Sequence, residues 1–304
     1  LTRDFNFLNR KLFGSRIGGS SKRKLIRILN EVSVISSQTY VNLDEISNDT
    51  LKQNLLFASE FACYLNPTGI IKPKDISDLL PPFNLLPPEI KEMVNVFVAQ
   101  LGRGGLKFCD DGIIRPLSTK DGEGSAFEAK LGYNDNTGRI FLSFRGTEFS
   151  AGRSGSIITD IQQHLGFIDK VYKRAISLAD MAGQCFGEDK LIISGYSMGG
   201  GMAQLAATVL ELDAIVVNPA PISKIILLRA NLSSNKLIRA SERIYQLSVK
   251  GDIVSDRPFK NSSESTTAQI GKKIILGKVN APLFSHFSDS GQANRYLQRS
   301  LHQD

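Results

Sequence analysis

The spacing of hydrophobic and polar positions changes along the chain near residue 106. Before this point, apolar residues recur every three or four positions, which predicts amphipathic helices over 49–65 and 88–100. After it, short apolar runs alternate with helical patterns, as in a mostly parallel sheet with helices on both faces. The expected strands cover 126–133, 139–144, 191–193, 214–217, 244–249 and 273–279, and the expected helices cover 167–186, 202–207, 223–230 and 293–301. The pattern therefore predicts an α/β fold.

The composition divides the chain into two parts. Residues 1–48 are basic and rich in Ser and Gly, with one expected helix over 22–30, and we interpret them as a flexible arm. Residues 49–304 form the expected domain, with a helical lead-in over 49–105 and a catalytic core over 106–304. No stretch approaches the ~20 consecutive apolar residues of a membrane-spanning helix.

The positive charge of the chain is concentrated at its N-terminus. Residues 1–40 hold eight Lys and Arg against two acidic residues, a net charge of +6, whereas the whole chain carries +7. Such a segment favours an anionic membrane surface, since each Lys or Arg near it contributes about 1 kcal/mol. A solvated tail and part of an export signal are the alternatives. No module or aromatic interleaving typical of nucleic-acid binding accompanies the charge.

The cysteines predict neither a disulfide framework nor a metal site. The chain has three cysteines, Cys63, Cys109 and Cys185, and their spacing is typical neither of a disulfide framework nor of a metal site. We expect Cys63 and Cys185 to be buried free thiols in a reducing compartment. No cofactor is expected. The N-terminal stretch lacks the apolar core of a secretory signal, so we expect synthesis in the cytoplasm without a visible signal peptide. The chain begins at Leu1, which leaves export open.

The most informative motif lies at residues 195–199. The apolar run 191–193 leads into Gly-Tyr-Ser-Met-Gly, and a helical pattern follows. A G-x-S-x-G motif between a strand and a helix is typical of a nucleophile elbow, which exposes the serine hydroxyl at the edge of the sheet. Ser197 is therefore the candidate nucleophile of a serine hydrolase. The alternative is a glycine-rich turn with an incidental serine.

A nucleophilic serine needs a general base, and the chain has only three histidines. In α/β-hydrolases the chain order is Ser, then acid, then His. His164 precedes Ser197 and His302 lies two residues from the end, whereas His286 lies in an expected loop before the last helix. This order favours His286 as the base, although a lone loop histidine is often only a surface residue.

The acid of such a site is expected at the carboxyl end of a late strand. Asp252 follows the expected strand 244–249 and lies between the serine and His286 in the chain. Asp256 is the second candidate and Asp289 the third. A structural alternative remains, in which Asp252 only caps a turn.

An oxyanion hole needs two donors that are fixed before the reaction begins. The backbone N–H of Met198, which follows the nucleophile, is the first candidate. Thr147, at the end of the expected strand 139–144, is the second, because Gly146 allows a tight turn and Thr147 offers both an N–H and a hydroxyl.

Several motifs in one order resemble the class 3 lipase family of α/β-hydrolases, which is related to filamentous-fungal lipases and to bacterial phospholipase A1-like effectors. The matching motifs are the strand 140–147 ending in F-R-G-T, Asp160, the H-x-G-F at 164–167, the elbow, Asn218-Pro219, and the acid motif at 251–258. The resemblance covers roughly 49–301. It implies a catalytic triad of Ser197, Asp252 and His286, with Thr147 and Met198 at the oxyanion.

The sequence departs from that family in three ways. Tyr196 and Met198 replace the usual His and Leu of the elbow, and the disulfides of secreted fungal members are absent. Any lid is confined to 148–159, a segment with little apolar surface. This short segment argues against strong interfacial activation.

These observations predict a lipid ester hydrolase that acts through an acyl-enzyme intermediate. A phospholipase A substrate is favoured over neutral fat, since the basic arm, the apolar Pro-rich loop 79–88 and the short lid suit an anionic bilayer. A soluble short-chain carboxylesterase is the first alternative. A non-catalytic membrane-binding module is the second. The basic arm on a disulfide-free body also resembles bacterial lipase effectors that are exported and act at a membrane surface. The sequence makes no prediction of oligomeric state.

Overall fold

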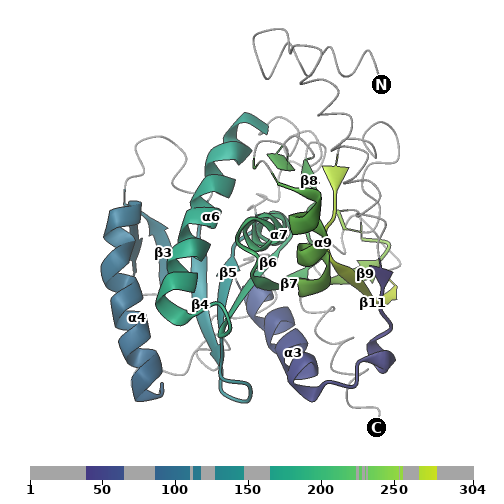
Figure 1. Ribbon diagram of the computed structural model, residues 1–304, viewed down its shortest axis with the longest axis horizontal. Helices are drawn as coiled ribbons and strands as arrows, with labels where there is room; N and C mark the ends of the chain where they lie inside the picture. Colours follow the sequence, from purple (N-terminus) through teal and green to yellow (C-terminus); the bar gives the residue numbers. More distant parts are fainter. Residues whose placement is uncertain are drawn as a thin grey trace, which may run out of the picture.

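A nine-stranded sheet forms the centre of the protein (Figure 1). The computed structural model describes residues 39–64, 86–109, 112–117, 127–146, 165–223, 226–227, 230, 232–252, 254–255 and 267–278. The strand order is β1-β11-β9-β7-β6-β5-β4-β3-β2. The strands are β1 (Thr39–Tyr40), β2 (Leu106–Phe108), β3 (Ile113–Pro116), β4 (Ala129–Asn134), β5 (Arg139–Phe144), β6 (Leu191–Tyr196), β7 (Asp213–Val217), β9 (Ile244–Lys250) and β11 (Lys272–Lys278). A separate antiparallel pair joins β8 (Ile222–Ser223) and β10 (Thr267–Ala268).

Most of the sheet is parallel. The neighbours from β1 to β5 pair in parallel, whereas β4, β3 and β2 extend the sheet antiparallel. The carboxyl ends of β5, β6, β7 and β9 therefore meet at one edge, which is where open α/β sheets place their functional groups. The predicted α/β fold with a mostly parallel sheet is confirmed.

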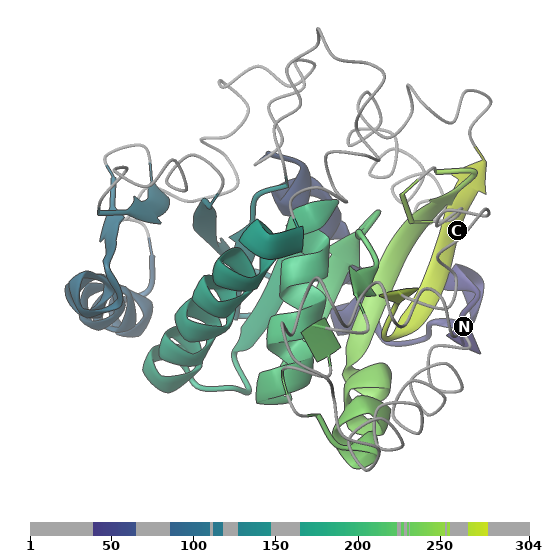
Figure 2. The same cartoon turned by 90° about the horizontal axis from the view of Figure 1, so that it is seen from above.

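Helices cover both faces of the sheet. The described helices include α3 (Asp49–Tyr64), α4 (Pro88–Leu101), α6 (Leu165–Phe186), α7 (Met198–Leu210) and α9 (Ser234–Arg243), with short 3-10 turns η1 (Leu43–Glu45) and η4 (Gly102–Gly104). In Figure 2, α3 lies behind the sheet and α6 and α7 lie in front of it. Two apolar clusters match these layers, because α3 packs on Phe141 and Ile192 and the other cluster joins α4, α6 and α7 to Leu142 and Phe144. None of the described helices is long and apolar enough to cross a bilayer.

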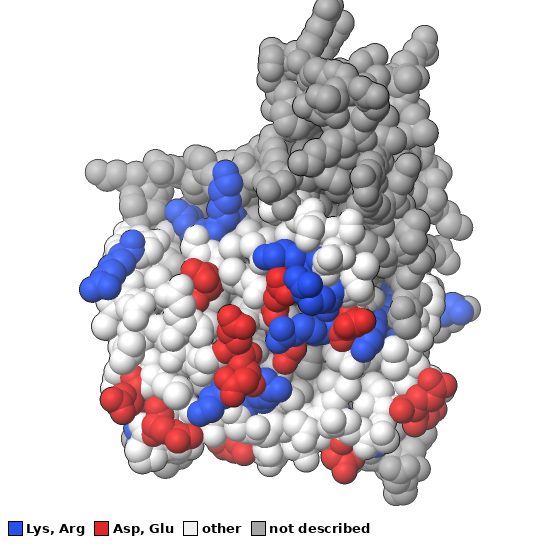
Figure 3. All heavy atoms as spheres, viewed as in Figure 1, with Lys and Arg blue, Asp and Glu red and all other residues white. Residues whose placement is uncertain are grey.

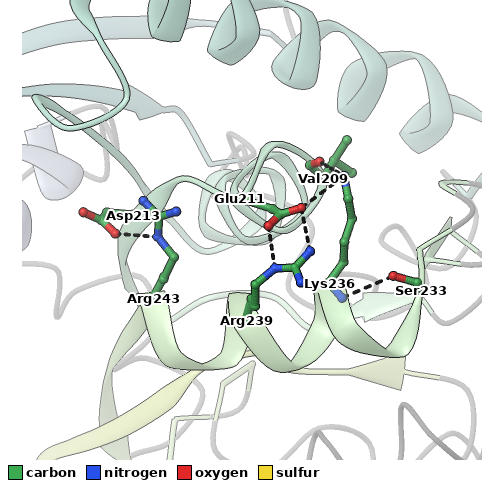
Figure 4. Close-up of polar contacts among 7 residues, drawn as sticks. All are labelled: Val209, Glu211, Asp213, Ser233, Lys236, Arg239 and Arg243. Atoms are coloured by element: carbon green, nitrogen blue, oxygen red, sulfur yellow. Dashed lines mark hydrogen bonds and ion pairs between the residues drawn. The ribbon is translucent and has the colours of Figure 1, made fainter.

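The hydrophobic pattern of the sequence did not predict helix α9. Only Leu237 and Ala240 of its ten residues are buried, so the apolar signal in this stretch is weak. Side-chain contacts hold it instead: Arg239 donates to both oxygens of Glu211 at 2.6 and 3.0 Å, and Lys236 donates to the carbonyl oxygen of Val209 at 2.9 Å (Figure 4). A polar helix can thus be fixed by contacts distant in sequence.

Two further expectations differ from the structure. β1 lies within the segment 1–48 that we expected to be an arm, and it pairs with β11, so residues from Thr39 onward belong to the sheet. Strand β8 includes Ser223, the first residue of the expected helix 223–230, whereas residues 226 and 227 are helical as expected. The expected helices 22–30 and 293–301 lie outside the described residues.

Candidate active site

Ser197 occupies a tight turn between β6 and α7. Its backbone angles are φ 53° and ψ −121°, a conformation that side chains rarely adopt. Surrounding hydrogen bonds hold it there, because its N–H donates to the carbonyl of Val217 at 3.2 Å and its carbonyl accepts from Ala220 N–H at 2.7 Å. The Ser197 side chain makes no capping hydrogen bond to α7. This is the backbone geometry of a nucleophile elbow.

Glycines around Ser197 allow backbone segments to touch. A Cβ on Gly195 would overlap the backbone of Gly199, and one on Gly199 would overlap the carbonyl of Phe144. A Cβ on Gly200 would lie 2.9 Å from Pro219 Cα, and one on Gly201 would lie 2.6 Å from the Tyr172 hydroxyl oxygen. The glycine run therefore extends beyond the motif because α7 lies close to three neighbouring segments.

The end of β5 packs directly on the elbow. A Cβ on Gly146 would lie 2.9 Å from the carbonyl oxygen of Tyr196 and 3.4 Å from Ser197 Cβ. Met198 is the first residue of α7, so its backbone N–H belongs to the positive N-terminus of that helix. The end of β5 and the start of α7 thus both lie beside Ser197, and the oxyanion-hole roles of Met198 and Thr147 stay predictions. Thr147 itself lies outside the described residues.

A buried carboxylate, which the sequence did not single out, holds the end of β5. Glu128 accepts from Arg115 Nε at 2.7 Å and also pairs with Arg145, and its carbonyl accepts the Arg145 N–H at 2.9 Å. Burying a charged group is costly unless it is paired, so Glu128 and Arg145 constrain each other. No local motif marks Glu128 in the sequence, since the strand that follows it, β4, also contains Lys130 and Asn134.

Asp252 lies in a buried turn after β9. The residue is 1% exposed, and its Oδ1 accepts from Val254 N–H at 2.9 Å, Ser255 N–H at 2.7 Å and Ser255 Oγ at 3.0 Å. These hydrogen bonds offset the cost of burying the carboxylate and fix its orientation. The second and third candidates, Asp256 and Asp289, lie outside the described residues.

Asn218 links the elbow to the Asp252 turn. It follows β7 with φ 41°, its N–H donates to the Leu247 carbonyl at 2.8 Å, and its Oδ1 accepts from Val249 N–H at 3.0 Å. Ser255 Oγ lies 3.4 Å from the same Oδ1. Val217, the residue before Asn218, accepts the Ser197 N–H through its carbonyl. The segment 217–218 therefore contacts both the Ser197 turn and the end of β9 that leads to Asp252.

The described residues therefore place Ser197, Met198 and Asp252 at the same edge of the sheet. His286, His164 and Thr147 lie outside the described residues, so their roles stay predictions. Within the part of the chain that the structure describes, no group of three His, Cys, Asp or Glu could hold a metal ion.

The cysteine predictions are tested only in part. Cys185 is a free thiol as predicted, but it is half-buried where the sequence predicted a buried residue, and this partial burial raises its pKa. Cys109 is also free and half-buried. The side chain of Cys63 lies outside the described residues.

Comparisons with known proteins identify the family of this chain. A family model described as "Phospholipase-like: Tle-like phospholipase domain" matches residues 105–301. The "Extracellular phospholipase A1" of Serratia liquefaciens is 34% identical over 193 residues, which are 62% of this chain and 56% of that protein. The chain thus spans just over half the length of this curated relative. The range matched by the family model contains Ser197, Asp252 and His286.

Two solved structures of fungal proteins are also similar. Lipase II from Rhizopus niveus gives a TM-score of 0.38 at 14% identity, over 76% of this chain and 82% of that one. A mutant of MDLA from Penicillium cyclopium gives a TM-score of 0.37 at 14% identity, over 78% of this chain and 81% of that one.

Proposed function

Since the chain belongs to the Tle-like phospholipase family, we propose that it is a serine-dependent phospholipase of the A type. The observation that carries this proposal is the strained turn at Ser197, which lies between a buried strand and a helix at the functional edge of the sheet. The backbone of Ser197 is strained at φ 53°, and such strain is typical of a nucleophilic serine at the turn between a strand and a helix.

The reaction follows from the roles of three residues. His286 removes the proton of the Ser197 hydroxyl as its oxygen attacks the acyl carbonyl, and Asp252 holds the imidazole in the required tautomer. The N–H groups of Met198 and Thr147 stabilise the resulting oxyanion. The intermediate collapses to an acyl-enzyme, and His286 protonates the leaving alcohol. Water, activated by His286, then attacks the acyl-enzyme and releases the fatty acid.

Charge supports an anionic phospholipid surface as the setting. The +6 segment 1–40 contrasts with the remainder of the chain, which carries +1. On the face shown in Figure 3, basic and acidic side chains are interspersed. The name of the Serratia relative, an extracellular phospholipase A1, also supports export to a membrane outside the producing cell. We infer that the basic segment holds the enzyme at that surface.

The test compares Ser197→Ala with the unaltered protein on phosphatidylglycerol vesicles. Fatty-acid release is expected to fall at least about 10⁴-fold, because the covalent step is lost. Ser194→Ala is the matched control: Ser194 is buried on β6, three residues earlier, and its hydroxyl has no hydrogen-bond partner in the described part of the chain. We expect this control to keep full activity.

Three results would contradict the proposal. Undiminished release by Ser197→Ala excludes Ser197 as the nucleophile. Hydrolysis restricted to short-chain soluble esters, with intact vesicles left uncut, indicates a carboxylesterase. Failure of a fluorophosphonate to label Ser197 indicates a non-catalytic membrane-binding module.

A further inference from the structure

A buried lysine contacts the turn that carries Asp252. Lys273 lies on β11 opposite Gln246 of β9, and the residue is only 2% exposed. Its Nζ donates to the carbonyl oxygen of Ser255 at 2.8 Å. An ammonium group is costly to bury, so a lysine in this position requires a specific reason.

Lys272, the residue before Lys273, lies on the opposite face of β11 and is less buried. Successive side chains of a strand point to opposite faces, and Lys272 is half-buried, with its Nζ 5.3 Å from the ring centre of Tyr245. Lys272 and Lys273 therefore carry the same charge at adjacent positions of one strand. Of these two lysines, Lys273 is the one that contacts the Ser255 carbonyl.

Ser255 connects the buried ammonium to the buried carboxylate. Its N–H and hydroxyl lie 2.7 and 3.0 Å from Asp252 Oδ1, and its carbonyl accepts from Lys273 Nζ and, at 3.0 Å, from Gln269 Nε2. One residue is thus fixed on its donor side by a negative charge and on its acceptor side by a positive charge. Hydrogen bonds to charged groups are the stronger ones, so this arrangement resists rotation of the turn.

We propose that Lys273 is a positioning residue that orients Asp252 through Ser255. The inference rests on the proposed function, in which Asp252 orients His286. Without the ammonium, the carbonyl of Ser255 loses its charged donor and the turn 252–255 gains freedom. The carboxylate then spends less time in the orientation that the imidazole needs. Proton transfer from Ser197 slows, whereas substrate binding does not change.

The first experiment measures kcat and KM of Lys273→Met on a monomeric short-chain phosphatidylcholine. We expect kcat to fall about 10- to 100-fold, the effect typical of a misplaced catalytic group, with KM within about twofold of its original value. Lys272→Met, with the same loss of charge on the same strand, is the matched control and should keep both values. Lys273→Arg, which retains a charged donor, should recover part of kcat.

The second experiment asks whether Lys273 acts through Asp252. Residues that act as a unit are non-additive, so adding Lys273→Met to Asp252→Asn should lower the residual rate less than about twofold further. If Lys273→Met lowers kcat by the full 10- to 100-fold in the Asp252→Asn variant, the inference is overturned. An equal loss of kcat in Lys272→Met would overturn it as well. A rise in KM with kcat unchanged would also overturn it.

A loss of kcat in Lys273→Met is informative only if this variant is folded. Circular dichroism and thermal unfolding report whether Lys273→Met is folded. If it is not, Gln269→Met removes the other donor to the Ser255 carbonyl, with an expected fewfold loss of kcat that is also non-additive with Asp252→Asn. An additive loss there counts against the inference. Failure of the proposed function is distinct, because it appears as activity in Ser197→Ala.

Discussion

The space around α7 determines which residues fit beside Ser197. Gly201 faces the hydroxyl of Tyr172, a buried side chain of α6, and burial raises the pKa of that hydroxyl above its ordinary value. Contact between α6 and α7 leaves no room for a methyl group at this position.

Gly201→Ala is expected to destabilise the protein by about 1 to 3 kcal/mol, the range typical of overpacking. The added Cβ would lie 2.6 Å from the Tyr172 hydroxyl oxygen and 3.0 Å from the carbonyl oxygen of Ala220. Denaturant unfolding measures the loss. Adding Tyr172→Phe removes the nearer oxygen and should recover part of the stability. Equal stability of the single and double variants would show that the hydroxyl is not the obstacle.

The sequence predicts residues that belong to a local motif better than residues that act across the sheet. Ser197 lies at the predicted elbow because strand, glycines and helix are contiguous in the chain. Glu128 and Lys273 carry no such pattern. Glu128 contacts Arg145, and Lys273 contacts Ser255, because neighbouring strands of the sheet are paired. These partners therefore depend on the register of the sheet, which the spacing of residues along the chain does not give.

Ion pairs fix α9 on the end of α7, where Figure 4 shows Arg239 and Lys236 directed toward Glu211. The hydrogen bond from Arg239, with the nearby positive charge of Lys236, lowers the pKa of Glu211 below its ordinary value. A carboxyl whose folded pKa is lowered stabilises the fold above its unfolded pKa. That contribution is lost as the pH falls through the folded pKa.

Glu211→Gln is therefore expected to lower Tm at pH 7, by no more than about 3 °C because the pair is exposed to solvent. The difference from the unaltered protein should shrink as the pH falls below 4.5, the ordinary pKa of a glutamate, and also at 1 M salt. Glu242→Gln, the same change at an exposed position of α9, is the control. A Tm difference that is constant across pH would rule out the ion pair as its cause.

Most elements with an apolar stripe were predicted to within three residues at each end, although α7 begins four residues before its expected start. The hairpin of β4 and β5, with its Asn-Asp-Asn-Thr-Gly turn, and the long helix α6 are examples. The helix α9 was missed because its stability comes from Glu211 and Val209, which the local pattern does not contain. Strand β1 was missed because two residues are too few to show alternation.

The net positive charge and the candidate catalytic residues lie in different parts of the chain. The candidate site lies at the carboxyl edge of the sheet, whereas most of the net positive charge precedes β1. Binding to an anionic surface and cleavage of an ester should therefore respond to different substitutions. This separation makes the membrane proposal testable without touching the site.

Replacing Lys22, Arg23, Lys24 and Arg27 by Gln is expected to weaken binding to phosphatidylglycerol vesicles by up to about 10³-fold. The estimate follows from about 1 kcal/mol for each basic residue near an anionic surface. Vesicle sedimentation at several salt concentrations measures the effect, which should be smaller at high salt. Phosphatidylcholine vesicles and kcat on a monomeric short-chain phospholipid are the controls. Since neither depends on an anionic surface, a comparable loss in either would show that the four residues act on folding or on the site, and not on attraction to the membrane.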